Sequence, residues 1–159
     1  SHREREKKLE ILKDSHCGAF ALIYTSLYLV VYAFAVCDIK KIDVPLCAVF
    51  VLERLLSALS VATFPLAKSS GLVHTFASAS AKRIVAFFCA LCFVLLSSAL
   101  IVFYALSGFA VVATSFVVFI GYYVIAKKEF GGITGDISGA FVQVTEICAM
   151  IVYCFVKSL

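Results

Sequence analysis

Residues 84–126, IVAFFCALCFVLLSSALIVFYALSGFAVVATSFVVFIGYYVIA, form an apolar stretch without a single charged side chain. The stretch is about twice as long as the roughly 20 helical residues that cross a hydrocarbon core of ~30 Å. Ser107 and Gly108 lie near its middle, where a chain that crosses twice must reverse. The stretch therefore predicts two membrane-spanning helices, Ile84–Leu106 and Phe109–Ala126, joined by a tight turn.

Three further apolar runs are long enough to cross a membrane: Ala19–Val36, Val44–Phe64 and Ile137–Val156. Hydrophobic residues make up 63% of the 159 residues and charged residues only 15%, far from the composition of soluble domains. Unbroken apolar runs of this length satisfy their backbone in lipid as helices. We therefore expect an all-α, polytopic integral membrane helical bundle of about five transmembrane helices. Membrane lipid surrounds such a bundle, no nucleic-acid partner is expected, and homo-oligomer formation is left open.

The basic residues are distributed unevenly between the two ends of the predicted helices. If the N-terminus is cytoplasmic, ten of the fourteen Lys and Arg residues lie on the cytoplasmic side and three on the other, while Arg54 lies within the second span. The positive-inside rule then predicts that residues 1–18 and the loops 65–83 and 127–136 face the cytoplasm. We expect residues 1–159 to form one membrane domain.

The sequence GGITGDISG, residues 131–139, lies between the fourth and fifth predicted spans. Its glycines would let a ligand approach the backbone closely, and Thr134 or Asp136 can cap the start of the fifth helix. A helix N-terminus favours anions because its first N–H groups are unsatisfied. The segment is therefore a candidate phosphate-binding loop, although it lacks the Gly-Lys-Ser/Thr ending of a P-loop.

Polar side chains continue from this loop along the fifth helix. Four residues spaced three, four and three apart share one stripe: Asp136, Gly139, Gln143 and Glu146. An ionisable residue about three turns into a span, such as Glu146, is by default a candidate functional residue. The structural alternatives are a capping role for Asp136, helix packing at Gly135 and Gly139, and a Glu146–Arg54 pair.

The N-terminal segment SHREREKKLEILKD carries a second charged stripe. Helical spacing would place four residues on one face: Glu10, Lys13, Asp14 and Cys17. Carboxylates from two helices that meet at the membrane surface favour Mg²⁺, which is usually held by one or two carboxylates and substrate phosphates. Arg54 could contact a phosphate bidentately or neutralise a carboxylate. A charged run is also typical of a solvated helix face with no such role.

Two motifs connect this chain to a known family. REREKKLEILKDSHCGAFAL, residues 3–22, looks like R-x-x-x-x-L-E-I-M-K/R-D-S-R-x-G, and GGITGDISGAFVQVTE, residues 131–146, looks like G-G-x-T-G-D-x-x-G-A with a downstream Glu. Weaker matches lie at Glu53-Arg54 and around Gly71. Along essentially its whole length the chain resembles the cobalamin synthases, membrane enzymes also called adenosylcobinamide-GDP ribazoletransferases.

The resemblance implies a Mg²⁺-dependent transferase of cobalamin (vitamin B12) biosynthesis in the prokaryotic inner membrane. Such an enzyme joins adenosylcobinamide-GDP to α-ribazole or its 5′-phosphate and releases GMP. The implied catalytic residues are Lys13, Asp14, Asp136 and Glu146, and the implied metal ligands are Asp136, Glu146, Asp14 and Glu10. The implied substrate-binding residues are Arg54, Ser15, Gly71, Gly131, Gly132, Thr134, Gly135 and Gln143.

The chain also departs from the family pattern, which leaves other functions open. In the family an aspartate-rich run, D-G-x-x-D-x-x-D, precedes the position of Ser1, and Gln143 stands where many members have a carboxylate. A catalytically incomplete fragment of the family is therefore one alternative. A non-catalytic membrane carrier or scaffold is another, with Arg54, Asp136 and Glu146 lining a polar pathway.

Overall fold

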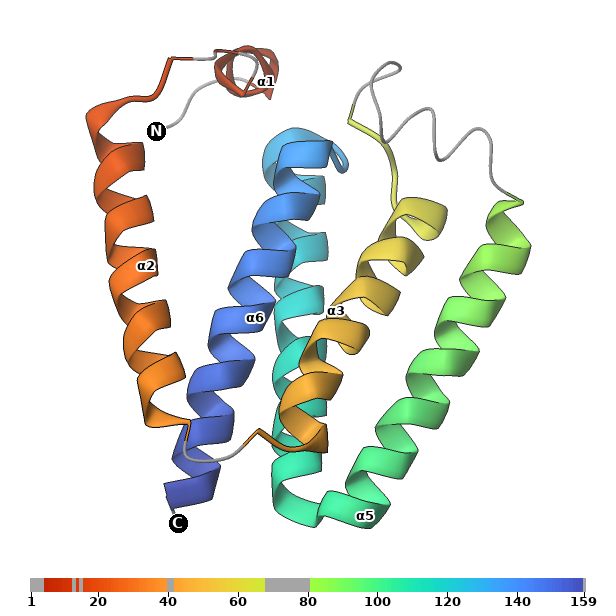
Figure 1. The fold of residues 1–159 in the computed structure, drawn as a ribbon. Coiled ribbons are helices and arrows are strands. Elements are labelled where there is room, and N and C mark those ends of the chain that lie inside the picture. Colours follow the sequence, from red (N-terminus) through yellow and green to blue (C-terminus); the bar gives the residue numbers. More distant parts are fainter. Residues whose placement is uncertain (1–4, 13, 15, 40–41, 68–80, 159) are drawn as a thin grey trace.

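The computed structural model describes residues 5–12, 14, 16–39, 42–67 and 81–158, and these residues form helices and no strand (Figure 1). The helices are α1 (Arg5–Ile11), α2 (Ala19–Asp38), α3 (Val44–Thr63), α5 (Lys82–Ile125), the π-helix η1 (Ala126–Phe130) and α6 (Gly135–Ser158). The predicted all-α fold is confirmed.

Helix α5 is a hairpin of two arms. Ala105 has φ 41° and ψ −112°, so the chain leaves helical geometry there, and Figure 1 shows the two arms running in opposite directions. Just after the reversal the arms are in close contact, because a Cβ on Gly108 would lie only 2.1 Å from the carbonyl oxygen of Leu100. The two predicted spans in residues 84–126 are therefore confirmed, with the reversal two residues before Ser107.

The long helices are apolar enough to cross a membrane. Counted with α5 and η1 as one unit, four helices of the described residues meet that condition. Because α5 reverses at Ala105, the described residues contain five segments of this kind. The protein is a multi-pass membrane protein, as the sequence predicts.

Three helices make up the packed body of the bundle. Helix α3 packs against both α5 and α6, around buried side chains that include Val49, Leu52, Val111 and Ala149. Helix α2 stands to one side of this body, and Ala35 is the one residue of α2 that is buried (Figure 1). Most apolar side chains of α2 are exposed, as expected for a helix in contact with lipid.

The connections between the helices lie at the two opposite ends of the bundle. Helix α1, the end of α3, the start of α5 and the link from η1 to α6 lie at one end, while the α2–α3 connection, the α5 reversal and the C-terminus lie at the other (Figure 1). At the second end, Asp43 accepts a hydrogen bond from the backbone N–H of Leu46 at 3.4 Å and forms an ion pair with Lys157 at 2.9 Å. The segments that carry the two motifs therefore share one end of the bundle.

Candidate functional site

The glycine-rich loop is joined to the segment that follows α3. Leu66 and Ile133 form a parallel β-bridge: the N–H of Ile133 donates to the carbonyl of Pro65 at 2.8 Å, and the N–H of Ala67 donates to the carbonyl of Ile133 at 3.0 Å. A Cβ on Gly132 would lie 2.4 Å from the oxygen of Pro65 and 2.6 Å from two further backbone atoms. Position 132 therefore has no room for a side chain, and its glycine serves this contact between two backbones.

Gly131 ends the π-helix η1 and begins the loop. It has φ 77° and ψ 1°, a left-handed conformation that strains residues with a side chain. The N–H groups of Gly131 and Gly132 both point to the carbonyl of Ala126, which satisfies an oxygen at the end of the helix. The left-handed turn thus explains the glycine at position 131, and the close backbone contact explains the glycine at position 132. Neither of these two explanations depends on a ligand.

The start of α6 has one capping residue and one exposed acid. The Oγ1 atom of Thr134 accepts a hydrogen bond from the N–H of Ile137 at 3.3 Å, and the Thr134 side chain is buried. Of the two predicted caps, Thr134 therefore fills this role. Gly135 and Asp136 are exposed, and among the described residues the Asp136 carboxylate has neither an ion-pair nor a hydrogen-bond partner. Asp136 is therefore free to meet a ligand at the helix start.

The four residues of the predicted polar stripe all lie on α6, but the two ends of the stripe are far apart. Asp136, Gly139 and Gln143 are exposed, whereas Glu146 is 9% exposed. Ten residues of continuous helix separate Asp136 from Glu146, a rise of about 15 Å. Mg²⁺ binds its ligands at about 2.0–2.1 Å, so these two carboxylates do not reach one ion. Among the described residues, no three His, Cys, Asp or Glu side chains are placed to hold a metal ion.

Glu146 has a partner that the sequence did not indicate. Tyr32 of α2 donates a hydrogen bond from its hydroxyl to Oε1 of Glu146 at 2.5 Å. The alternative of a Glu146–Arg54 pair is wrong, because the Arg54 side chain is 71% exposed and its Nε lies 3.6 Å from Glu53. Glu53 is fully buried, and neither of its carboxylate oxygens has a hydrogen-bond partner among the described residues.

The N-terminal stripe does not form as one helical face. Helix α1 ends at Ile11, so the spacing from Glu10 to Cys17 does not follow a single helix. Glu10 is exposed on α1, and Asp14 follows it in irregular chain. The backbone N–H of His16 donates to the Asp14 carboxylate at 2.9 Å, and Nδ1 of His16 lies 2.8 Å from the same oxygen. These two hydrogen bonds lower the pKa of Asp14, the backbone contact contributing most.

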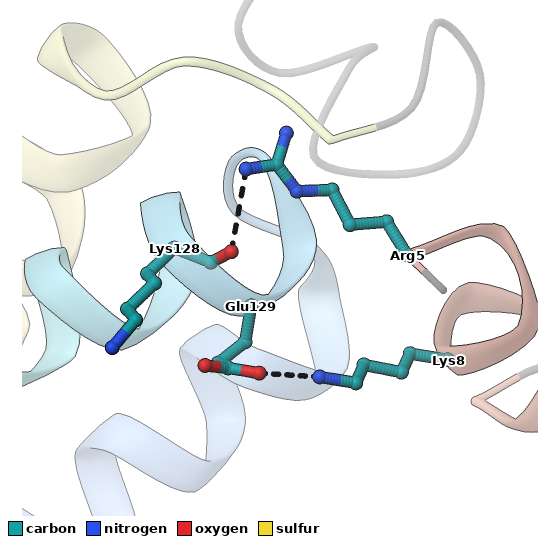
Figure 2. Close-up of polar contacts among 4 residues, drawn as sticks. All are labelled: Arg5, Lys8, Lys128 and Glu129. Carbon is teal, nitrogen blue, oxygen red and sulfur yellow. Dashed lines mark hydrogen bonds and ion pairs between the residues drawn. The ribbon is translucent and has the colours of Figure 1, made fainter. Parts of the chain in front are cut away.

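Three predicted site residues, Lys13, Ser15 and Gly71, lie outside the described residues. The sequence also missed a contact between the two motif segments. Lys8 of α1 forms an ion pair with Glu129 of η1, and Nη2 of Arg5 donates to the carbonyl of Lys128 at 3.3 Å (Figure 2). The available signal was charge, since the basic residues 1–18 and the loop 127–136, which contains Glu129, were both predicted to face the cytoplasm.

The site that emerges is a surface site at one end of the bundle. An exposed carboxylate stands at the start of α6, the loop before it is tied to the end of α3, and a basic helix contacts the preceding π-helix. Basic side chains and helix N-termini favour phosphate, and a carboxylate favours a hard cation. The arrangement suits a charged, phosphate-bearing ligand at the membrane surface.

Comparisons with known proteins identify relatives of this chain. The adenosylcobinamide-GDP ribazoletransferase of Lachnoclostridium phytofermentans is 36% identical over 94% of this chain and 58% of its own length. The enzymes of the same name from Desulfitobacterium hafniense and Geobacillus kaustophilus are 29% and 30% identical, over 92% and 90% of this chain and 59% and 56% of their own lengths. The chain thus spans a little under three fifths of these curated relatives. No solved structure matches it.

The family match covers nearly the whole chain and includes both motif segments. It extends over residues 1–154, from the segment that contains α1 to the last turns of α6. Together with relatives that are similar along nine tenths of the chain, this match shows that the protein belongs to the cobalamin-5-phosphate synthase family.

Proposed function

We propose that the protein acts in cobalamin biosynthesis as an adenosylcobinamide-GDP ribazoletransferase. The reaction joins adenosylcobinamide-GDP to α-ribazole, or to its 5′-phosphate, and releases GMP. Family membership and the names of the relatives support this proposal. Because the chain spans less than two thirds of those relatives, the activity is proposed for the gene product that contains it.

One observation carries the proposal on the structural side: the glycine loop is held by backbone contacts so that an exposed carboxylate, Asp136, stands in the first turn of α6. Transfer at a pyrophosphate needs positioning and charge neutralisation and requires no covalent nucleophile. A fixed loop next to a helix N-terminus can provide both for the GDP moiety. Gln143, about two turns further along α6 and exposed, offers an amide to the same ligand.

Mg²⁺ is proposed as the cofactor. Asp136 fits this role because it is exposed and because Mg²⁺ is commonly held by one or two carboxylates together with substrate phosphates. Glu10 and Asp14 are further candidate ligands from the N-terminal segment. Glu146 is better assigned to the α2–α6 contact, since it lies about 15 Å further along the helix and accepts the Tyr32 hydrogen bond. When bound, Mg²⁺ would neutralise pyrophosphate charge.

The site end is proposed to face the cytoplasm of a prokaryotic cell. The uneven distribution of Lys and Arg supports this orientation, because seven of the nine that the structure describes belong to segments at the end that carries α1 and the glycine loop. Cysteine-accessibility labelling of intact cells, with single substitutions near Lys127 and near Lys157, would test it. Protection at 127 together with labelling at 157 is the expected result.

A transferase assay in membranes tests the function directly. GMP release from adenosylcobinamide-GDP and α-ribazole would be followed with and without Mg²⁺, for this chain and for the complete gene product that contains it. Mg²⁺-dependent release by the complete product is the expected result. Activity in that product alone would identify this chain as an incomplete catalytic unit, and activity in neither would favour the non-catalytic carrier or scaffold.

A further inference from the structure

Helix α1 lies against a segment more than 120 residues further along the chain. Figure 2 shows the two polar contacts, Lys8 with the carboxylate of Glu129 and Arg5 with the backbone carbonyl of Lys128. Both partners belong to η1, a π-helix. Such i→i+5 turns are rare and are frequently found at functional sites.

Arg5 also lies close to the first residue of the glycine loop. A Cβ on Gly131 would lie 3.6 Å from Nη1 and 3.8 Å from Cδ of Arg5, which is ordinary van der Waals contact. The short α1 helix therefore contacts both the π-helix and the turn that begins the loop. This places the N-terminal motif segment beside the loop that leads to Asp136.

These contacts are too exposed to be a main source of stability. The Lys8 side chain is 22% exposed and that of Glu129 is 41% exposed. An ion pair in such surroundings adds little to the stability of a protein, because water screens the two charges. The buried packing of α3, α5 and α6 holds the bundle, so the contribution of the α1 contacts is to set where α1 lies.

We propose that Lys8 and Glu129, supported by Arg5, are positioning residues that hold the N-terminal motif segment over the glycine loop. In this arrangement α1, which carries Glu10, stays at the end of the bundle where α6 begins with the exposed Asp136. The positioning role rests on the proposed transferase function. The contact itself is independent of that function and has a test of its own.

Zero-length cross-linking tests the contact. A carbodiimide joins a carboxylate to an amine that it touches, and mass spectrometry of the digested membrane protein should reveal a Lys8–Glu129 link. The Asp43–Lys157 pair, 2.9 Å apart at the opposite end, is an internal positive control. Glu129→Gln should lose the first link and keep the second. Formation of the control link without the Lys8–Glu129 link would overturn the proposal.

Charge exchange tests the positioning role in the complete gene product. Lys8→Glu and Glu129→Lys should each lower kcat/KM by roughly tenfold, and the double exchange should restore most of it, because neighbouring residues are energetically coupled. Lys82→Glu is the matched control, since it makes the same charge change on an exposed side chain at the start of α5 and should leave kcat/KM unchanged.

Two outcomes would contradict the positioning role. Single variants as active as the wild type, or a double variant no better than the singles, would show that the contact does not support the reaction. If the wild type forms the cross-link but releases no GMP, the proposed function fails, and the positioning role fails with it.

Discussion

Tyr32 of α2 and Glu146 of α6 are joined by a hydrogen bond of 2.5 Å between the Tyr32 hydroxyl and Oε1 of Glu146. Tyr32 is 114 residues away in sequence, and its helix is the least buried of the spans. The hydrogen bond satisfies a carboxylate that would otherwise be costly at this depth. It also gives α2 a specific attachment to the packed body of the bundle.

Removal of the Tyr32 hydroxyl should weaken this attachment. Tyr32→Phe is expected to lower the free energy of unfolding by about 1–2 kcal/mol, because it leaves a largely buried carboxylate without its donor. The measurement is unfolding in mixed micelles with increasing SDS. Tyr24→Phe, on an exposed residue of the same helix, should change the free energy by less than about 0.5 kcal/mol. Equal effects of the two variants would mean that the hydrogen bond contributes nothing.

A side chain at position 132 should disrupt the contact between the glycine loop and Pro65–Ala67. In Gly132→Ala the nearest atoms to the new Cβ are all backbone atoms, 2.4–2.6 Å away, so one of the two segments must move. We expect a loss of about 1–3 kcal/mol in the free energy of unfolding. The matched change Gly139→Ala meets no atom within 4 Å on α6 and should be neutral or stabilising. Unchanged stability of Gly132→Ala would show that the two segments separate at little cost.

Acid should weaken the end of the bundle that carries Asp43. Burial alone would raise the pKa of Asp43, but hydrogen bonds from Lys157, Tyr153 and the Leu46 N–H outweigh it, so the pKa is lowered below 3.8. A lowered folded-state pKa stabilises the fold above the unfolded-state value, and this contribution is lost as the pH falls through the folded-state value.

Asp43→Asn should therefore lose less stability than the wild type between about pH 5 and pH 3. Asparagine can still cap α3, so the variant removes the charge and keeps the cap. Thermal unfolding in detergent across this pH range is the measurement. Asp38→Asn, a nearby exposed acid, should retain the wild-type loss of stability. If Asp43→Asn lost as much stability as the wild type over this pH range, the charge of Asp43 would not be the source of the loss.

Removal of the exposed carboxylate at the start of α6 should abolish the proposed activity. Asp136→Asn keeps the shape of the side chain and removes the charge of the proposed metal ligand, so GMP release by the complete gene product should fall by roughly 100-fold or more. Chelation of divalent ions with EDTA should have a similar effect on the wild type and be reversed by Mg²⁺. Asp38→Asn, at the other end of the bundle, is the control. Full activity of Asp136→Asn would remove Asp136 from the site.

Local sequence was enough to predict the spans and the capping residue at the start of α6. The uncharged stretch 84–126 predicts a hairpin of helices because no other arrangement places 43 such residues in lipid, and the hairpin is confirmed. The prediction of Thr134 or Asp136 as a cap follows from residue type, and Thr134 fills that role. The reversal was predicted two residues late, because sequence periodicity does not define where a turn closes within an apolar run.

Partners distant in sequence were decided by the tertiary structure. Nothing local to Tyr32 distinguishes it from other aromatic residues of α2, and only the packing of α2 beside α6 brings it to Glu146. Tertiary structure also separates Asp136 from Glu146, because residues that share one stripe of a helix can still lie about 15 Å apart along its axis. The predicted N-terminal stripe does not form because α1 ends at Ile11. Asp14 lies beyond the end of the helix and therefore does not share a helical face with Glu10.

The amino-acid sequence by itself determined the membrane-spanning helices, the segments that meet at one end and the family to which the chain belongs. These follow from hydrophobicity, charge and motif, which are properties of neighbouring residues. The tertiary structure decided which side chains meet across the bundle: Tyr32 with Glu146, Lys8 with Glu129, and the glycine loop with Pro65–Ala67. The physical reason is that such contacts depend on how the helices pack and where each one ends, and packing is a property of the whole chain.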